Sequence, residues 1–194
     1  MLAGELYNPL ADELCELRLR LHKLIDRFNR TSDDETELRS SLLTQFLGHA
    51  GARLEMTPPV RFDYGCNTYI GDRCYFNFNA TFLDCAEIHI GDDVFVGPNV
   101  SFLTPIHPFL ARERNFRFDA EGRKSDQEYA KPIRIGNSVW IAGGVIINPG
   151  VTIGSNCVIG SGSVVTRDIP DGVLAFGNPC RVIRKLTEAD ALIR

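Results

Sequence analysis

Residues 135–165 read IGNSVW IAGGVI INPGVT IGSNCV IGSGSV V, one six-residue pattern repeated five times in succession. Isoleucine opens every hexad, and the fifth position holds a small residue, which is Val, Cys or Ser. Gly, Ala or Asn follows the isoleucine, where a tight corner needs backbone freedom. Self-similarity at a short fixed period is the signature of a solenoid, in which each unit covers the next.

The same pattern occurs earlier in the chain with one interruption. Hexads open at Ile70, Phe76 and Phe82, and after a slip of two residues the series resumes at Ile90. Because strand side chains alternate between faces, a hexad combines a short strand with a corner, and three hexads close one turn after about eighteen residues. We therefore expect a mainly β protein, a triangular parallel β-helix with its first and fifth positions inside. A sandwich of unrelated strands would need hairpin signals every 8 to 12 residues or so, and these are missing.

The first third of the chain predicts helices. Apolar residues recur at spacings of three and four over residues 8–29, which indicates one amphipathic helix. Ser32 or Asp33 is expected to cap a second helix that ends near Gly48. Residues 53–62 contain two adjacent prolines and are predicted to form an extended connector.

Composition indicates an ordinary globular protein. The chain has 194 residues, of which 44% are apolar and 24% charged, with a net charge of −4. These values exclude a disordered or low-complexity chain. Basic clusters, an apolar span and a basic leader are all missing, so we expect a cytoplasmic protein that binds neither nucleic acid nor membrane. The six cysteines form no close CxxC pair, and we expect reduced thiols that serve as small core residues.

The repeat stops for about thirty residues between Phe102 and Ile133, and loops of that length are usually functional or disordered. His107 lies at the root of this loop, held between Ile106 and Pro108. The other histidines occupy the predicted helices or, at position 89, the outward face of a strand, where we expect structural roles. The predicted organisation is a helical segment at residues 1–57, a solenoid at 58–186 with an inserted loop at 103–132, and a tail at 187–194.

The chain resembles the maltose and galactoside O-acetyltransferases, a branch of the hexapeptide-repeat acyltransferases that have a left-handed β-helix. The resemblance rests on MLAGELY at residues 1–7, FDYGCNTYIGDRCYFNFN at 62–79, IGDDVFVGPNV at 90–100, the THP-like stretch at 104–108, VWIAGGVIINPGVTIG at 139–154 and GNPCRVIRKL at 177–186. It implies a homotrimer that moves the acetyl group of acetyl-CoA to a sugar hydroxyl, with no metal. His107 would then be the general base, because imidazole titrates near neutrality.

The resemblance also implies an acceptor site and a donor site. The residues expected near the acceptor are Asn77, Asp84, Tyr75, Arg18 and Cys85. Those expected near acetyl-CoA are Trp140, Ala142, Gly143, Ser161, Thr166, Arg167, Arg181 and Arg184, with a backbone N–H of the Ala142–Gly143 turn as a candidate oxyanion donor and the arginines suited to phosphates. Trp140 could instead pack in a subunit interface. The roles of Asp63, Asn8 and Asp12 are left open, because this chain departs from the family pattern at these positions.

Two other functions are known for solenoids of this kind or compatible with one. The γ-class carbonic anhydrases share the solenoid but need three histidines around zinc, whereas the coils here contain only His89, with His107 in the loop. A scaffold or sugar-binding solenoid without catalysis would not account for the grouping of His107, Asn77, Asp84 and Trp140. Serine, antibiotic and lipo-oligosaccharide acceptors also stay open, as does the choice between a glucosyl and a galactosyl unit.

Overall fold

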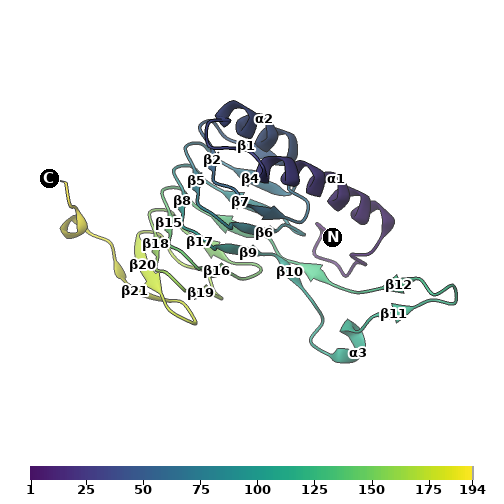
Figure 1. Ribbon diagram of the computed structural model, residues 1–194. Coiled ribbons are helices and arrows are strands. Elements are labelled where there is room, and N and C mark those ends of the chain that lie inside the picture. Colours follow the sequence, from purple (N-terminus) through teal and green to yellow (C-terminus); the bar gives the residue numbers. More distant parts are fainter. Residues whose placement is uncertain (194) are drawn as a thin grey trace.

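The computed structural model describes residues 1–193, and it shows a tapering stack of triangular coils with two helices laid across one end (Figure 1). Each coil contributes one strand to each of three parallel sheets. Sheet 1 contains β1 (His49–Ala50), β4 (Thr68–Ile70), β7 (Ile88–Ile90), β14 (Ile133–Ile135) and β17 (Thr152–Ile153). Sheet 3 contains β3 (Arg61–Phe62), β6 (Thr81–Leu83), β9 (Ser101–Leu103), β16 (Ile146–Ile147) and β19 (Val164–Val165).

Sheet 2 lies between these two in chain order and continues to the C-terminal end of the solenoid. It contains β2 (Glu55–Met56), β5 (Tyr75–Phe76), β8 (Phe95–Val96), β15 (Trp140–Ile141), β18 (Val158–Ile159), β20 (Val173–Phe176) and β21 (Arg181–Lys185). The last pair is antiparallel, so β21 folds back along β20 and ends the stack. A 3₁₀ turn, η1 (Glu188–Asp190), follows in the tail.

The interior is filled by the hexad positions that the sequence pattern assigned to it. Ile141, Ile147 and Ile153 are fully buried, and the fifth-position residues Val145 and Cys157 are buried beside them. In the upper coils Phe62, Phe82 and Phe102 stack face to face, with ring centroids 4.3 and 4.8 Å apart. The inward orientation of the first and fifth positions is therefore confirmed.

A column of polar side chains locks the corner between sheets 1 and 2. At this corner a side-chain oxygen accepts the backbone N–H of the equivalent residue one coil earlier, at 2.7 to 3.1 Å; the acceptors are Asp72, Asp92, Asn137, Ser155 and Asp171. Each such bond satisfies a backbone donor that the corner removes from the sheets. The hexad pattern alone does not predict this column.

The corner between sheets 3 and 1, which we call the wide corner, is longer in the upper coils. Tyr69 pairs with His89, a spacing of twenty residues, whereas Arg134 pairs with Thr152, a spacing of eighteen. The two extra residues follow β6, which is the slip seen in the sequence, and the same addition follows β3. The long insertion after β9 occupies this corner in the third coil, so all three additions to the hexad period fall on one edge of the prism.

The first coil begins earlier than expected. Residues 49–62 form β1, β2 and β3, which pair in parallel with β4, β5 and β6, so the predicted boundary at residue 58 falls inside this coil. Residues 53–62 are extended, as predicted, but they form corners and strands of the first turn and not a connector. Met56 and Phe62 fill the inward positions there.

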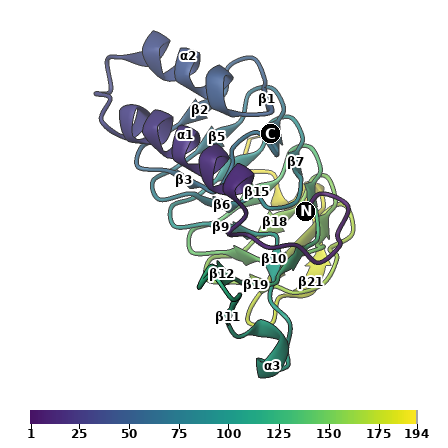
Figure 2. The same ribbon diagram turned by 90° about the vertical axis from the view of Figure 1, so that its right-hand side faces the viewer.

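Two helices close the open end of the prism. They are α1 (Asp12–Asn29) and α2 (Thr36–Phe46), and Phe28 and Phe46 pack edge to face with ring centroids 5.9 Å apart. Helix α1 lies beside β3 and β6 (Figure 2). The predicted cap at Ser32 or Asp33 is wrong: α2 starts three residues later, the Ser32 N–H donates to the Glu35 carboxylate, and Asp33 pairs with Arg39. No helix among residues 1–193 is both long and apolar enough to cross a membrane.

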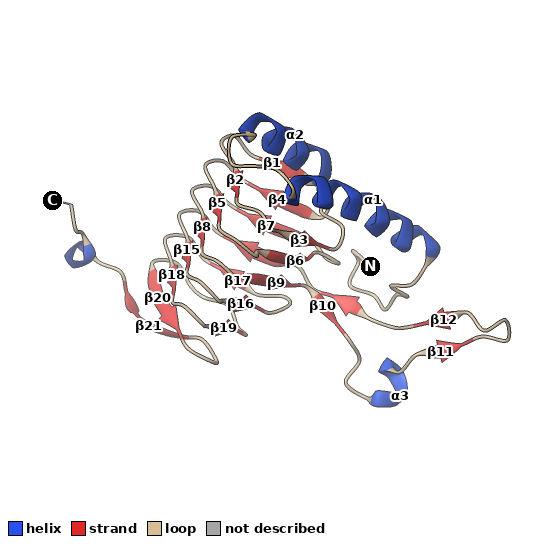
Figure 3. Cartoon of the chain, viewed as in Figure 1, coloured by secondary structure: helices blue, strands red, loops and turns tan. Residues whose placement is uncertain are grey.

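The insertion forms an arm that projects away from the stack (Figure 3). Its root is an antiparallel pair, β10 (Pro105–Ile106) with β13 (Tyr129–Ala130). Farther out lie α3 (Ala111–Arg114) and the hairpin of β11 (Arg117–Phe118) and β12 (Lys124–Ser125). The arm therefore begins and ends at the wide corner.

Stacked isoleucines hold the coils together, and this is testable on one strand. Ile153→Ala removes a fully buried side chain, so it should lower the free energy of unfolding by about 2–5 kcal/mol. Thr152→Ala, at the exposed neighbouring position, is the matched control and should change it far less. Urea denaturation followed by circular dichroism measures both, and equal effects of the two variants would contradict the assignment of the core.

Candidate active site

The wide corner brings together side chains from three coils, the arm and the N-terminal segment. They surround a cavity of about 270 Å³ lined by Pro9, Arg18, Asp63, Tyr64, Leu83, Cys85, Pro105, His107 and Glu128. Three of the sequence-predicted residues, Arg18, Cys85 and His107, are among them. The departures from the hexad period thus create a hollow on a prism whose faces are otherwise flat.

His107 lies between two carboxylates. Its Nε2 atom is 3.7 Å from Glu128 Oε2, and its Nδ1 atom is 3.9 Å from Asp126 Oδ2. The imidazole is about half exposed, whereas the side chains of Glu128 and Asp126 are 9% and 12% exposed. The pairing of β10 with β13 produces this arrangement, because it places residues 107 and 128 side by side at the root of the arm. An imidazole in this position can accept a proton from a bound hydroxyl group.

The N-terminal segment anchors both carboxylates. Tyr7 and Glu128 exchange two backbone hydrogen bonds, of 2.9 and 3.1 Å, and the Tyr7 hydroxyl donates to Glu128 Oε1. Asn8 Oδ1 accepts the backbone N–H of Asp126 at 3.2 Å. Burial raises the pKa of the Tyr7 hydroxyl, so this group stays protonated and donates. Asn8, whose role was open, therefore serves the loop that carries His107.

Sequence reasoning missed Tyr7, Asp126 and Glu128. The acids stand two residues apart in DQEY, at the point where the loop returns to the repeat. Alternate residues of a strand face the same side, so this spacing was the available signal. Nothing local indicated that they return to His107, since that depends on the pairing of β10 with β13.

Asp84 is fully buried, and both oxygens of its carboxylate accept hydrogen bonds from the same chain. Its Oδ1 accepts the Tyr64 N–H at 2.8 Å, and its Oδ2 accepts the Thr68 hydroxyl at 3.1 Å. Burial raises the pKa of this carboxyl group. Asp84 thus fixes the backbone of the wide corner next to Tyr64. Its side chain does not line the cavity.

Asp63 lines the cavity, together with Glu128. Its only hydrogen bond within residues 1–193 comes from the Cys85 thiol, at 3.5 Å from Oδ2, and burial raises the pKa of the Asp63 carboxyl group. Burial also raises the pKa of the Cys85 thiol, which keeps it in the unreactive protonated form. Arg18 reaches the same hollow, where its Nη1 atom donates to the Tyr64 hydroxyl at 2.5 Å.

The predicted acceptor residues Tyr75 and Asn77, and the predicted donor residue Trp140, lie elsewhere on the chain. Tyr75 and Trp140 share an outward row of sheet 2 with Phe95, and Phe95 and Trp140 are 55% and 54% exposed. Asn77 lies at the corner between sheets 2 and 3, where its Oδ1 accepts the Phe78 N–H at 2.7 Å. The structure of one chain does not bring these residues to His107.

The predicted donor residues occupy several edges. Ala142, Gly143 and Ser161 line the corner between sheets 2 and 3, and Thr166 and Arg167 follow β19 at the wide corner. The Ala142 N–H donates to the Ile159 carbonyl at 2.9 Å, whereas among residues 1–193 the Gly143 N–H has no hydrogen-bond acceptor. Gly143 is therefore the member of this pair with a backbone donor to offer.

The two remaining arginines lie on the terminal strand. Arg181 is exposed at the start of β21, and Arg184 forms a two-point ion pair with Asp190, at 2.6 and 2.8 Å. An anion can therefore reach the guanidinium of Arg181 without displacing a carboxylate, whereas at Arg184 it would have to displace Asp190.

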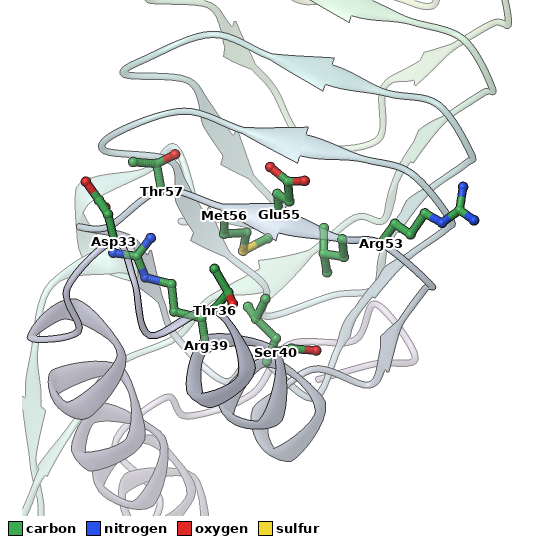
Figure 4. Close-up of a pocket in the computed structure, with 10 residues that line it drawn as sticks. Asp33, Thr36, Arg39, Ser40, Arg53, Glu55, Met56 and Thr57 are labelled. Atoms are coloured by element: carbon green, nitrogen blue, oxygen red, sulfur yellow. Dashed lines mark hydrogen bonds and ion pairs between the residues drawn. The ribbon is translucent and has the colours of Figure 1, made fainter.

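A larger cavity, of about 510 Å³, lies between α2 and the first coil (Figure 4). Its walls carry Asp33, Thr36, Arg39, Ser40, Glu55 and Thr57, and none of the sequence-predicted site residues lines it. Its buried cation, Arg39, is already bound to Asp33 at 2.9 Å and to Thr31. Among residues 1–193 no group of three or more His, Cys, Asp or Glu side chains is arranged to hold a metal ion.

Two family models match the chain. Residues 1–51 match the maltose acetyltransferase hexapeptide capping motif, and residues 132–167 match the bacterial transferase hexapeptide of six repeats. A galactoside O-acetyltransferase of Escherichia coli is 44% identical over 188 residues, which cover 97% of this chain and 88% of that protein.

Solved structures share the whole architecture. A maltose O-acetyltransferase from Clostridium difficile superposes with a TM-score of 0.89 at 44% identity, covering 96% of this chain and 95% of that one. A hexapeptide-repeat acetyltransferase from Vibrio cholerae, solved with acetyl coenzyme A, gives a TM-score of 0.83 at 35% identity and covers 97% of each chain.

The buried hydrogen bonds of Asp84 give a stability test of the wide corner. Asp84→Ala leaves the Tyr64 N–H and the Thr68 hydroxyl without their acceptor, which should lower the free energy of unfolding by about 1–3 kcal/mol. Asp63→Ala, one coil earlier at the same corner, removes an acid with a single weak partner and should cost less. Chemical denaturation measures the free energy of unfolding of both variants. A larger decrease for Asp63→Ala than for Asp84→Ala would contradict these roles.

Proposed function

The chain belongs to the family of maltose and galactoside O-acetyltransferases, and we propose that it transfers the acetyl group of acetyl-CoA to a hydroxyl group of a sugar. The observation that carries the proposal is the position of His107 in the wide-corner cavity, with a carboxylate within 4 Å of each ring nitrogen. This supplies the base that such a reaction needs, because a sugar hydroxyl is a poor nucleophile until its proton is removed.

In the proposed reaction His107 accepts the proton of the acceptor hydroxyl as its oxygen attacks the thioester carbon. A carbon–oxygen bond forms, and the resulting tetrahedral intermediate collapses with cleavage of the carbon–sulfur bond. The imidazolium then returns the proton to the departing CoA thiolate, so atoms and charge balance and no acyl-enzyme forms. Glu128 and Asp126 lie within 4 Å of the ring nitrogens while the imidazole carries the proton between these two steps.

Donor binding is assigned to the lower coils. The Gly143 N–H is the backbone donor suited to the developing oxyanion, because its neighbour Ala142 is already bonded to the next coil. Arg167 and Arg181 are exposed and free of ion pairs among residues 1–193, which suits them to the phosphates of CoA.

A homotrimer would complete the site. His107 stands at the wide corner, whereas Asn77, Tyr75 and Trp140 belong to sheet 2 and its corner with sheet 3. Rotational packing of three copies brings different edges of neighbouring prisms together. In that arrangement His107 of one chain would meet the amide of Asn77 on the next, and the exposed rings of Phe95 and Trp140 would be covered.

Loss of the base tests the reaction. His107→Ala should lower acetyl-CoA-dependent thiol release in the presence of sugars by about 10²- to 10⁴-fold, the usual contribution of a general base. Glu128→Gln should lower it less, because the imidazole remains while one of its two carboxylates loses its charge.

His89→Ala is the matched control, because that histidine stacks on Tyr69 on sheet 1. It should leave turnover unchanged. Undiminished activity in His107→Ala would show that His107 is not the base. Wild-type protein that releases no thiol with any sugar would contradict the proposal of a sugar acceptor.

A further inference from the structure

A second cavity adjoins the one that contains His107. It has a volume of about 430 Å³ and lies between α1 and sheet 3, and Asp63 and Leu83 line both cavities. Ligand pockets in proteins typically measure about 300–1,000 Å³. The His107 cavity alone, at about 270 Å³, falls below that range, whereas the two together fall within it.

The two cavities share continuous walls. On α1, Arg18 faces the His107 cavity, and His22 and Asp26 follow at intervals of four residues and face the second one. Residues four apart lie on one stripe of a helix, so one row of polar side chains runs along both cavities.

The opposite wall comes from β3 and β6. Arg61 pairs with Thr81, and residues 63 and 83 follow on the same outward face, while Phe62 between them points inward. Arg61 and Asp63 are two residues apart on one strand, about 6–7 Å. The wall therefore offers a cationic donor and a carboxylate acceptor at consecutive steps from the second cavity toward His107.

Several of these polar groups are uncommitted. Within residues 1–193 the side chains of Asp26, Arg61 and Thr81 make no hydrogen bond or ion pair, and Asp63 has only the Cys85 thiol. His22 and Asn29, by contrast, already bond to the backbone of Phe62 and Val60. Free donors and acceptors alternate along the cleft, which suits the hydroxyl groups of a carbohydrate.

The lining excludes other classes of ligand. Asp26 and Asp63 would repel an anionic group, with Arg61 as the one cation among the cavity's uncommitted groups. The apolar side chains Ile25 and Phe62 are 6% and 4% exposed, so they offer little surface to an acyl chain.

We propose that this second cavity is a sugar subsite, and that the acceptor is a neutral di- or oligosaccharide. The inference rests on the proposed sugar acetylation. The unit that receives the acetyl group lies at His107, and the adjoining unit lies between Asp26 on α1 and Arg61 on β3. Asp63, at the junction, bonds hydroxyls of either unit, since a carboxylate accepts hydrogen bonds on both oxygens.

The test compares glucose with maltose, and galactose with lactose, as acceptors in the thiol-release assay. For wild-type protein kcat/KM should be at least about tenfold higher for the better disaccharide than for its monosaccharide, the effect of one or more hydrogen bonds to charged groups. Arg61→Ala should reduce this ratio toward one. Arg134→Ala, an exposed arginine of sheet 1, is the matched control and should leave the ratio as it is.

Binding of maltose and lactose to the CoA-loaded protein, measured by calorimetry, separates the two proposals. Acetylation of monosaccharides with no disaccharide advantage would overturn the subsite and leave the proposed function standing. Disaccharide binding that weakens in Arg61→Ala, without any turnover, would support the subsite while the acetylation proposal fails. Binding that is identical in wild type and Arg61→Ala would overturn the subsite whatever the turnover.

Discussion

The stacking of equivalent inward side chains from coil to coil is the constraint on which the rest of the structure depends. Phe62, Phe82 and Phe102 lie directly over one another, and Ile147 and Val165 continue the column in the lower coils. A one-residue slip within a strand would turn these side chains to solvent, so the strands cannot absorb insertions. Extra residues must therefore leave the prism at a corner and return in register.

The chain uses one corner for this purpose. The additions after β3 and β6 carry Asp63, Tyr64 and Cys85, and the addition after β9 carries the arm with His107. Because equivalent corners stack, residues that are far apart in sequence are presented along one edge. The N-terminal segment then crosses this edge, and its contacts from Tyr7 and Asn8 hold the two carboxylates beside His107. The regular coils thus support an irregular site that is built from the corner additions, the arm and the N-terminal segment.

The hexads were sufficient to predict the parallel coils, their inward positions and the place of the loop. The first coil was missed because its first positions are Ala50, Met56 and Phe62 and not isoleucine, and because residues 49–62 include two adjacent prolines. Sequence resemblance selected Asp84 as a residue facing the acceptor, yet its carboxylate is buried against Tyr64 while Asp63 faces the cavity. The roles of Tyr7 and Glu128 depend on an antiparallel bridge across more than a hundred residues, for which no local pattern exists.

The separation of His107 from Asn77 on one chain leads to the central claim, that the working site is shared between neighbouring subunits. The direct measurement is complementation: His107→Ala and Asn77→Ala chains carrying different tags are assembled together, and mixed oligomers are purified through both tags. If each site takes His107 from one chain and Asn77 from the next, every mixed trimer has one intact site, and thiol release reappears to about a third of the wild-type level. Mixed oligomers no more active than the parent variants would contradict the shared site.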